Sequence, residues 1–278
     1  MAGFCRPCIA SGPEERLKAE VSFFSDSLHQ GRAFGSRGSQ GVAFHICNSF
    51  KEAGLWTRVQ SFRYAGVTGH NIIAFSPGFY DEYIVVGAYY DGLGKIDSGW
   101  SPGADSNASG IAALLSLAFT LAHEPRHSAG IIFVAFDGHH SDLSGSRAFV
   151  DRFLDEYKVS MMVNLDILGG TSAPVKAGVS DYLIALGGRE YAWDMDRANR
   201  RLGLHISYDY YGSSRFTDLF YRSISDQKWF LERKIPAVMF TSGITMDTNR
   251  ITDTVDKVDF PVYARRVEMI GRWISMKL

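Results

Sequence analysis

Apolar segments that alternate with helical segments constrain the fold of this chain most strongly. Residues 83–88 and 130–136 are continuous apolar runs, typical of strands that are covered on both faces of a sheet. Between them, residues 109–122 carry apolar side chains nearly all round a predicted helix. Strands joined by helices in this order predict the α/β class, with a mostly parallel, mixed central sheet and helices on both faces.

The same alternation extends over the rest of the chain. Further strands are predicted at residues 59–64, 71–75, 160–168, 181–185 and 235–240. Further helices are predicted at residues 14–29, 41–53, 147–157, 189–203 and 262–276. Residues 31–41 are rich in Gly, Ser and Arg, so we expect a loop there.

Length and composition fit one such domain. The chain has 278 residues, of which 46% are hydrophobic and 21% charged, as in ordinary globular proteins. No repeat, low-complexity tract or linker divides it. We therefore predict an N-terminal tail at residues 1–13 and a single domain at residues 14–278.

Several classes of protein are disfavoured by charge and hydropathy. A net charge of -1 argues against nucleic-acid binding, which needs a cationic surplus. No apolar run approaches the length of a membrane span, and the first residues lack the pattern of a signal peptide. Cys5 and Cys8 have the spacing of a redox or metal-binding pair, but no strand precedes them, so we interpret them as ordinary terminal cysteines.

Polar residues follow three of the predicted strands, at Tyr89-Tyr90-Asp91, Asp137-Gly138-His139-His140 and Asn164-Leu165-Asp166. The loop Gly103–Gly110 lies between the first two clusters. Because the carboxyl ends of parallel strands meet at one sheet edge, we expect these clusters to form a site. Two simpler interpretations stay open: Asp105 or Asn107 caps the next helix, and the two histidines are merely solvated.

The ordered set of motifs resembles the co-catalytic di-zinc aminopeptidases of metallopeptidase clan MH, whose fold also hosts the glutaminyl cyclases. That family reads Gly-x-His-x-Asp, then Gly-Ala-Asp-Asp-Asn-Ala-Ser-Gly, then Glu-Glu and Asn-x-Asp after successive strands. This chain matches at residues 87–91, 103–110, 133–146, 164–166, 225–226, 235–243 and 253–258. The resemblance covers nearly the whole chain and implies the zinc-dependent exopeptidase fold. It also implies an exported protein, in the periplasm or secreted.

Some positions of the family's metal site are retained. Carried over residue by residue, the resemblance implies that Asp105 and Asp166 are metal ligands. It also implies that Asp91 orients the first ligand through a hydrogen bond.

Other positions are substituted. Tyr89 replaces the first histidine ligand, His139 the general-base glutamate and His140 the second glutamate, which is a ligand. Asn249 replaces the C-terminal histidine ligand. The second acid of the loop is Ser106, and the Ser-Asp-His motif has become Ser225-Asp226-Gln227.

These substitutions weaken the expected metal chemistry. A catalytic zinc ion takes about three protein ligands. The phenol of Tyr89, with an ordinary pKa of ~10, must lose its proton to bind zinc well, and the amide of Asn249 is a poor zinc ligand. We therefore expect no intact di-zinc centre, and either no zinc or one weakly held ion on Asp105, Asp166 and His140. Beside such a cation, His139 would stay neutral or bind the metal itself, rather than replace the missing base.

The sequence favours a member of this family with a degenerate metal site, impaired or inactive as a peptidase, that binds a peptide-like ligand. Tyr90, Trp100, Asp226 and Gln227 are predicted to line the ligand cleft. The alternative is an active aminopeptidase or glutaminyl cyclase that uses the single ion. Residues 99–103 also match the serine-hydrolase motif Gly-x-Ser-x-Gly, but they lack its strand-turn-helix context.

Overall fold

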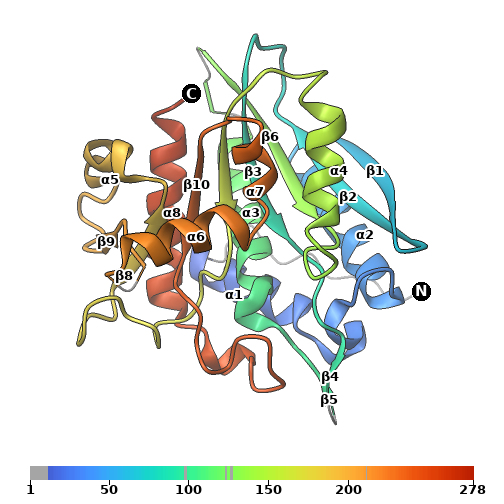
Figure 1. Ribbon diagram of the computed structural model, residues 1–278, viewed down its shortest axis with the longest axis horizontal. Helices are drawn as coiled ribbons and strands as arrows, with labels where there is room; N and C mark the ends of the chain where they lie inside the picture. The colour runs from blue at the N-terminus through green and yellow to red at the C-terminus, as the bar shows by residue number, and fades with distance from the viewer. Residues whose placement is uncertain (1–11, 97–98, 123, 126–127, 211) are drawn as a thin grey trace.

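An eight-stranded mixed sheet forms the centre of the protein (Figure 1). The structure is a computed structural model that describes residues 12–96, 99–122, 124–125, 128–210 and 212–278. The order of the strands across the sheet is β1-β2-β6-β3-β7-β10-β8-β9. Their bounds are Trp56–Tyr64 (β1), Val67–Phe75 (β2), Tyr83–Tyr89 (β3), Gly130–Phe136 (β6), Val159–Leu165 (β7), Tyr182–Leu186 (β8), His205–Ser207 (β9) and Ala237–Thr241 (β10). A separate hairpin consists of β4 (Lys95–Ile96) and β5 (Gly99–Trp100).

The middle of the sheet is parallel. β3 pairs in parallel with both β6 and β7, and β7 pairs in parallel with β10. β8 and β9 are also parallel, whereas β1 with β2, β2 with β6 and β10 with β8 are antiparallel. The predicted α/β fold with a mostly parallel, mixed sheet is confirmed.

Helices cover both faces of the sheet (Figure 1). On one face lie α1 (Pro13–Phe24), α2 (Arg37–Glu52), α3 (Gly110–Leu121) and α8 (Phe260–Ser275), with α5 (Ala192–Ala198) packed on α8. On the other face lie α4 (Ser144–Phe153), α6 (Ser214–Ser223) and α7 (Lys228–Glu232). Short helical segments are η1 (Ser27–Arg32), η2 (Ala104–Ser109), η3 (Arg189–Tyr191) and η4 (Val255–Lys257).

The pleat of β3 decides which face its last residue reaches. Ile84 and Val86 belong to the core that includes α3, while Val85 and Tyr89 belong to the core that includes α4 and α7. This alternation follows from the two-residue period of a strand. The Tyr89 ring therefore lies on the same side of the sheet as the segment between α6 and α7.

The N-terminal region differs from its prediction. Residues 31–41 were expected to be a loop, but η1 extends to Arg32 and α2 begins at Arg37. The hydroxyl oxygen of Ser36 accepts a hydrogen bond from the Ser39 N–H at 3.1 Å, so Ser36 is the N-cap of α2. The glycines within residues 31–41 favoured a loop in the prediction and outweighed the capping signal of Ser36. The predicted helix at residues 189–203 also ends early, at Ala198.

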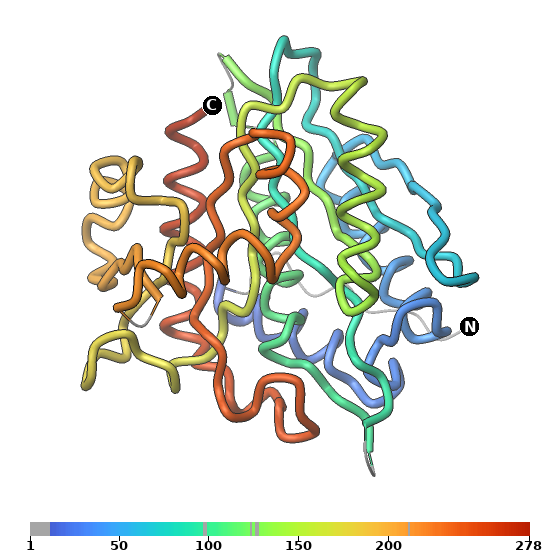
Figure 2. Tube along the Cα trace, in the orientation of Figure 1, coloured from blue at the N-terminus to red at the C-terminus, as the bar shows by residue number. Residues whose placement is uncertain are grey.

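The loops that follow the strands gather at one end of the molecule. The β4–β5 hairpin and the loop between β10 and α8 both lie at the lower edge of Figures 1 and 2. They approach each other where a Cβ placed on Gly99 would lie 3.3 Å from Cγ2 of Ile251.

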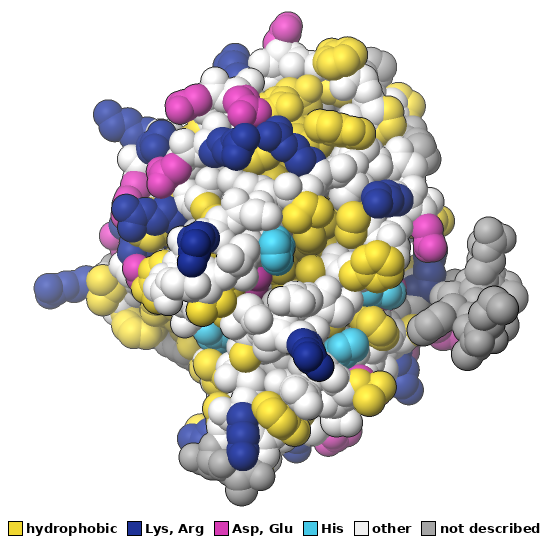
Figure 3. All heavy atoms as spheres, turned by 90° about the vertical axis from the view of Figure 1, so that its right-hand side faces the viewer, with side chains coloured by type: hydrophobic (Ala, Val, Ile, Leu, Met, Phe, Trp, Pro, Cys, Tyr) yellow, Lys and Arg dark blue, Asp and Glu magenta, His cyan; other side chains and the backbone are white. Residues whose placement is uncertain are grey.

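The surface carries charges of both signs. Figure 3 views the side formed by β1 and α2, where basic, acidic and hydrophobic side chains are interspersed. Phe44 and Trp56 are among the exposed hydrophobic residues of these elements. Within the described part of the chain, every helix is too short or too polar to cross a membrane.

Candidate functional site

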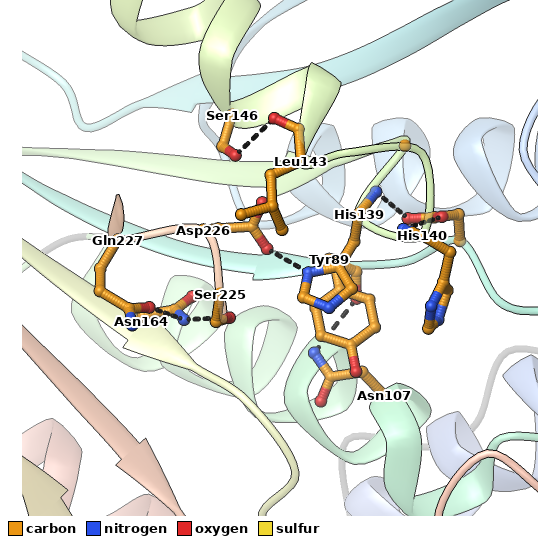
Figure 4. Close-up of polar contacts among 12 residues, drawn as sticks. Tyr89, Asn107, His139, His140, Leu143, Ser146, Asn164, Ser225, Asp226 and Gln227 are labelled. Carbon is orange, nitrogen blue, oxygen red and sulfur yellow. Dashed lines mark hydrogen bonds and ion pairs between the residues drawn. The ribbon is translucent and has the colours of Figure 1, made fainter. Parts of the chain in front are cut away.

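The predicted polar clusters meet at the carboxyl ends of the central strands (Figure 4). Tyr89 ends β3, and His139 and His140 follow β6. Asp166 follows β7, and Asp226 lies between α6 and α7. The ends of these strands therefore lie near one another in the fold.

His139 is held between Tyr89 and Asp226. Its Nδ1 lies 2.9 Å from Oδ2 of Asp226, whose side chain is fully buried. Its ring stacks on the phenol ring of Tyr89, with centroids 3.6 Å apart and an interplanar angle of 11°. Figure 4 shows the imidazole lying flat on the phenol, with Asp226 beside it.

The charge of His139 is set by its carboxylate neighbours. Burial by itself would lower the pKa of this imidazole, but Asp226, with smaller contributions from Asp166 and Asp91, raises the pKa to about 9. His139 is therefore an imidazolium at neutral pH. A protonated imidazole accepts no proton, so in this state His139 does not replace the missing general base.

His140 is neutral at neutral pH, unlike His139. Burial, together with the positive charges of His139 and Arg32, lowers the pKa of His140 to about 3. Its ring meets the Tyr89 ring edge-on, at 5.6 Å and 86°. Its Nε2 is buried and has no hydrogen-bond partner among the described residues.

Asp91 holds the backbone of the two histidines. Its Oδ1 accepts from the His139 N–H at 2.8 Å, and its Oδ2 accepts from the His140 N–H at 3.1 Å. Burial, with the nearby Asp137, raises the pKa of Asp91 to about 7. Asp91 was predicted to orient the first metal-ligand position; the structure has its two oxygens accept from the histidine amides instead.

The turn after His140 is constrained. Asp142 and Leu143 have positive φ angles of 59° and 53°, which are unfavourable for residues other than glycine. The Leu143 carbonyl accepts from Nε1 of Trp229 and from the hydroxyl of Ser146, each at 3.1 Å. These bonds tie the turn to α7 and to the first turn of α4.

Asp105 braces the loop instead of facing the site. Its Oδ1 accepts from the Gly169 N–H at 2.7 Å and from the Ser109 hydroxyl at 3.1 Å, and its Oδ2 accepts from the Gly170 N–H at 3.0 Å. A Cβ on Gly170 would lie only 2.6 Å from Oδ2, so the carboxylate packs directly on this backbone. In the structure the Asp105 carboxylate thus holds the backbone of Gly169 and Gly170, whereas the resemblance implied a metal ligand at this position.

Ser106 is the loop residue that faces the site. Its Oγ lies 3.3 Å from the Tyr89 hydroxyl and 3.3 Å from Oδ1 of Asn249. Asp253 fixes this orientation, because its carboxylate accepts from the backbone N–H groups of both Asp105 and Ser106. The one sequence signal for Ser106 is its place at the second acid of the family's Asp-Asp pair.

Arg32 joins the end of β3 to the same loop. Its buried guanidinium donates to the carbonyls of Tyr90, Pro102 and Gly103, at 3.1, 2.7 and 3.0 Å. Sequence reasoning assigned no role to this residue, because a single arginine in a glycine-rich segment carries no local signal for burial.

The donor set does not fit a zinc ion. Three of the substituted positions, Tyr89, Ser106 and Asn249, bring neutral groups to one place, and burial with the Asp166 charge keeps the pKa of Tyr89 well above its usual value. Zinc prefers thiolate, imidazole or carboxylate ligands. Among the residues that the structure describes, no three Cys, His, Asp or Glu side chains form a group that could hold a metal ion. The arrangement of Asp105, Asp166 and His140 predicted for a single ion thus has no geometric support.

The predicted ligand cleft is only partly accessible. Trp100 is 42% exposed, but Tyr90 and Gln227 are buried. The Tyr90 hydroxyl donates to the His70 carbonyl at 2.7 Å, and Oε1 of Gln227 accepts from Asn164 at 2.7 Å. Both side chains are committed inside the protein, so their predicted place in a cleft is corrected.

Comparisons with known proteins agree with this fold. The chain superposes on a zinc aminopeptidase from Bacillus subtilis with a TM-score of 0.76, at 14% identity, covering 95% of each chain. It superposes on a glutaminyl cyclase from Fimbriiglobus ruber with a TM-score of 0.77, at 18% identity, covering 99% of each chain. At these identities the likeness shows a shared fold.

Sequence comparison gives the family. The chain is 28% identical over 163 residues to the uncharacterized protein YfbL of Escherichia coli strain K12, and the match spans 56% of this chain and 50%, or half, of that relative. The sequence profile of peptidase family M28 matches residues 71–274. Because this match covers well over half of its length, the chain belongs to peptidase family M28.

Proposed function

We propose that this chain is a member of family M28 that has lost metal-dependent hydrolysis and binds a peptide-like ligand at the ends of β3, β6 and β7. The observation that carries the proposal is the contact of Ser106 with Tyr89 and Asn249. These are three neutral groups, and two of them, Tyr89 and Asn249, stand where the family's sequence pattern has ligands. The protonated His139 supports it, since the position of the base holds a cation.

The ligand class follows from the surroundings of the site. Asn249 is exposed, and the loop that carries it also exposes Ile244, Met246 and Ile251. Trp100 is exposed on the neighbouring hairpin. Apolar side chains beside amide and hydroxyl groups suit a ligand with a peptide backbone and hydrophobic side chains. The Bacillus subtilis structural neighbour, an aminopeptidase, is consistent with such a ligand.

Metal content and turnover test the loss of hydrolysis. The purified chain, loaded with zinc and desalted, is examined by elemental analysis and assayed with aminoacyl anilides and with an N-terminal glutaminyl peptide. We expect zinc far below one ion per chain and no turnover of either substrate. Stoichiometric zinc with turnover that His140→Ala and Asp166→Ala abolish would establish the alternative, a single-metal aminopeptidase or cyclase.

Thermal shift with a set of dipeptide amides tests the binding half of the proposal. Dipeptides with apolar side chains are expected to raise the melting temperature, and Trp100→Ala is expected to reduce that rise. Phe119→Ala on α3 is the control, since Phe119 is also an exposed aromatic residue but lies outside the site. If no dipeptide amide stabilises the chain, the proposed ligand class is wrong.

A further inference from the structure

Strand β1 forms one edge of the sheet, and no described residue pairs with its outer side. It is the last strand in the order of the sheet and pairs with β2 alone (Figure 1). All nine of its residues have a partner in β2, in one unbroken register. The opposite edge is β9, which has only three residues. A long edge strand without a bulge offers its unpaired backbone groups to another strand.

The contacts of His70 show which backbone groups of β1 point outward. His70 in β2 lies opposite Ser61 in β1. The His70 N–H donates to Oδ2 of Asp137 at 3.1 Å, and the His70 carbonyl accepts from the Tyr90 hydroxyl at 2.7 Å. Both groups of His70 therefore point away from β1, so Ser61 and His70 form a pair without hydrogen bonds. Because the two kinds of pair alternate along an antiparallel ladder, every second residue of β1 directs its N–H and C=O to the outer side. These outward residues are Thr57, Val59, Ser61 and Arg63.

Strand β1 lacks the features that usually protect an edge strand from pairing. It contains neither proline nor lysine. Its two arginines are engaged within their own chain. The guanidinium of Arg58 lies 4.9 Å from the centroid of the Phe153 ring, and its Nη1 is 3.4 Å from Oε2 of Glu156. Arg63 donates to the Gly66 carbonyl at 3.3 Å. The outer side of β1 is therefore open to a partner strand.

The sequence of β1 is complementary to itself. A two-fold axis perpendicular to the sheet would pair two copies of β1 in antiparallel orientation and keep each side chain on its own face. With this axis at Gln60, the two strands overlap along their whole length. Trp56 of one copy then lies opposite Tyr64 of the other. In the same way, Arg58 lies opposite Phe62. Aromatic pairs and cation–aromatic pairs stabilise antiparallel strands, and no like charges lie opposite each other in this register.

We propose that the outer side of β1 is the docking surface for a second copy of this chain, which continues the sheet across a two-fold axis at Gln60. The outward N–H and C=O groups of Val59 then bond to those of Ser61 in the second copy. Side chains along the strand are available for the contact, since Trp56 is 60% and Val59 50% exposed. Figure 3 looks onto this side of the molecule. The inference is independent of the proposed function, because no residue of β1 belongs to the candidate site.

Sedimentation velocity measures the self-association directly. We expect the unmodified chain to change from one copy to two between about 1 and 100 μM. Val59→Lys with Ser61→Lys places like charges opposite each other across the axis, so we expect it to raise the dissociation constant about 10-fold or more. Val59→Glu with Ser61→Lys places opposite charges at the same positions. This second pair is expected to bring the dissociation constant back to within about 3-fold of that of the unmodified chain.

Phe119→Lys with Leu219→Lys is the matched control. It adds the same two charges at exposed apolar positions of α3 and α6, outside β1, and is expected to leave the dissociation constant unchanged. The melting temperature of each variant, measured at a concentration where the chain is a single copy, shows whether the variant is folded. If the paired lysines prevent folding, Ser61→Pro takes their place, because it removes an N–H that points to the outer side of the strand.

Residue-resolved hydrogen exchange distinguishes pairing through β1 from association through another surface. When two copies associate, the outward amides of β1 are expected to exchange about 10-fold more slowly or less, whereas the intervening amides, already bonded to β2, are expected to change little. A chain that stays a single copy over the whole concentration range overturns the proposal. A dimer that the paired lysines leave intact, or in which the outward amides exchange as freely as in the single copy, overturns it as well.

Discussion

Asp105→Ala separates a structural carboxylate from a metal ligand. The Asp105 carboxylate accepts from the N–H groups of Gly169 and Gly170 and from the Ser109 hydroxyl, at 2.7, 3.0 and 3.1 Å. Truncation leaves two buried backbone donors without an acceptor, and each such loss costs about 1–3 kcal/mol. Removing the buried charge itself offsets part of this cost, because burial raises the pKa of Asp105. We expect a net loss of about 3 kcal/mol in the free energy of unfolding.

Urea unfolding followed by circular dichroism, with EDTA and with zinc, measures this loss. If Asp105 braces the loop, the loss is the same in both conditions. If Asp105 were a metal ligand, the variant would match the unmodified chain in EDTA and fall behind only in zinc. Asp155→Ala, a change at an exposed aspartate after α4, is the control for aspartate truncation and is expected to leave the unfolding midpoint unchanged. A loss below about 1 kcal/mol in EDTA would refute the reasoning.

Three further predictions follow from the same contacts. The unmodified chain is expected to exceed His139→Gln in free energy of unfolding by the largest amount below pH 6.5. This difference is expected to shrink by about 3 kcal/mol as pH rises through about 9, because the folded state holds the proton of His139 more tightly than the unfolded state does. A difference that stays constant in urea titrations across this range contradicts the raised pKa. Gly170→Ala is expected to cost about 1–3 kcal/mol, because its Cβ would lie 2.6 Å from Oδ2 of Asp105. Gly12→Ala controls for the added methyl group, because nothing lies within 4 Å of its Cβ and its φ is -61°. EDTA is expected to leave the melting temperature of the unmodified chain unchanged, and a fall in calorimetry would point to a bound metal.

The fold could be predicted because its signals extend over whole elements. Residues 83–88 and 130–136 are continuous apolar runs, which are typical of a strand buried on both faces of a sheet. The position of the site followed from the same logic, since Tyr89, His139 and Asp166 each come at the end of such a strand. Long periodic segments average over many side chains, so a single unusual residue does not change the prediction.

The orientation of single side chains could not be predicted in the same way. Asp105 and Ser106 are neighbours in one loop, and the choice of which faces the site depends on Asp253, 148 residues away from Asp105 along the chain. The burial of Gln227 likewise depends on a contact with Asn164 in another element. Contacts of this kind are set by tertiary packing, which no local spacing encodes.

Several of the residues at the substituted positions contact one another, so changes at these positions are physically coupled. A histidine in place of Tyr89 would offer an imidazole to a metal, but the imidazolium of His139 would still lie beside it and repel the ion. A glutamate in place of His139 would instead leave Asp226 without its cation and add a further carboxylate to a buried acidic group. A neutral Tyr89, by contrast, gives the imidazolium a favourable aromatic face and gives Ser106 a hydroxyl partner. Tyr89 thus contacts two other substituted positions, His139 and Ser106, so we expect a single reversion at Tyr89 to destabilise the site without rebuilding a metal centre.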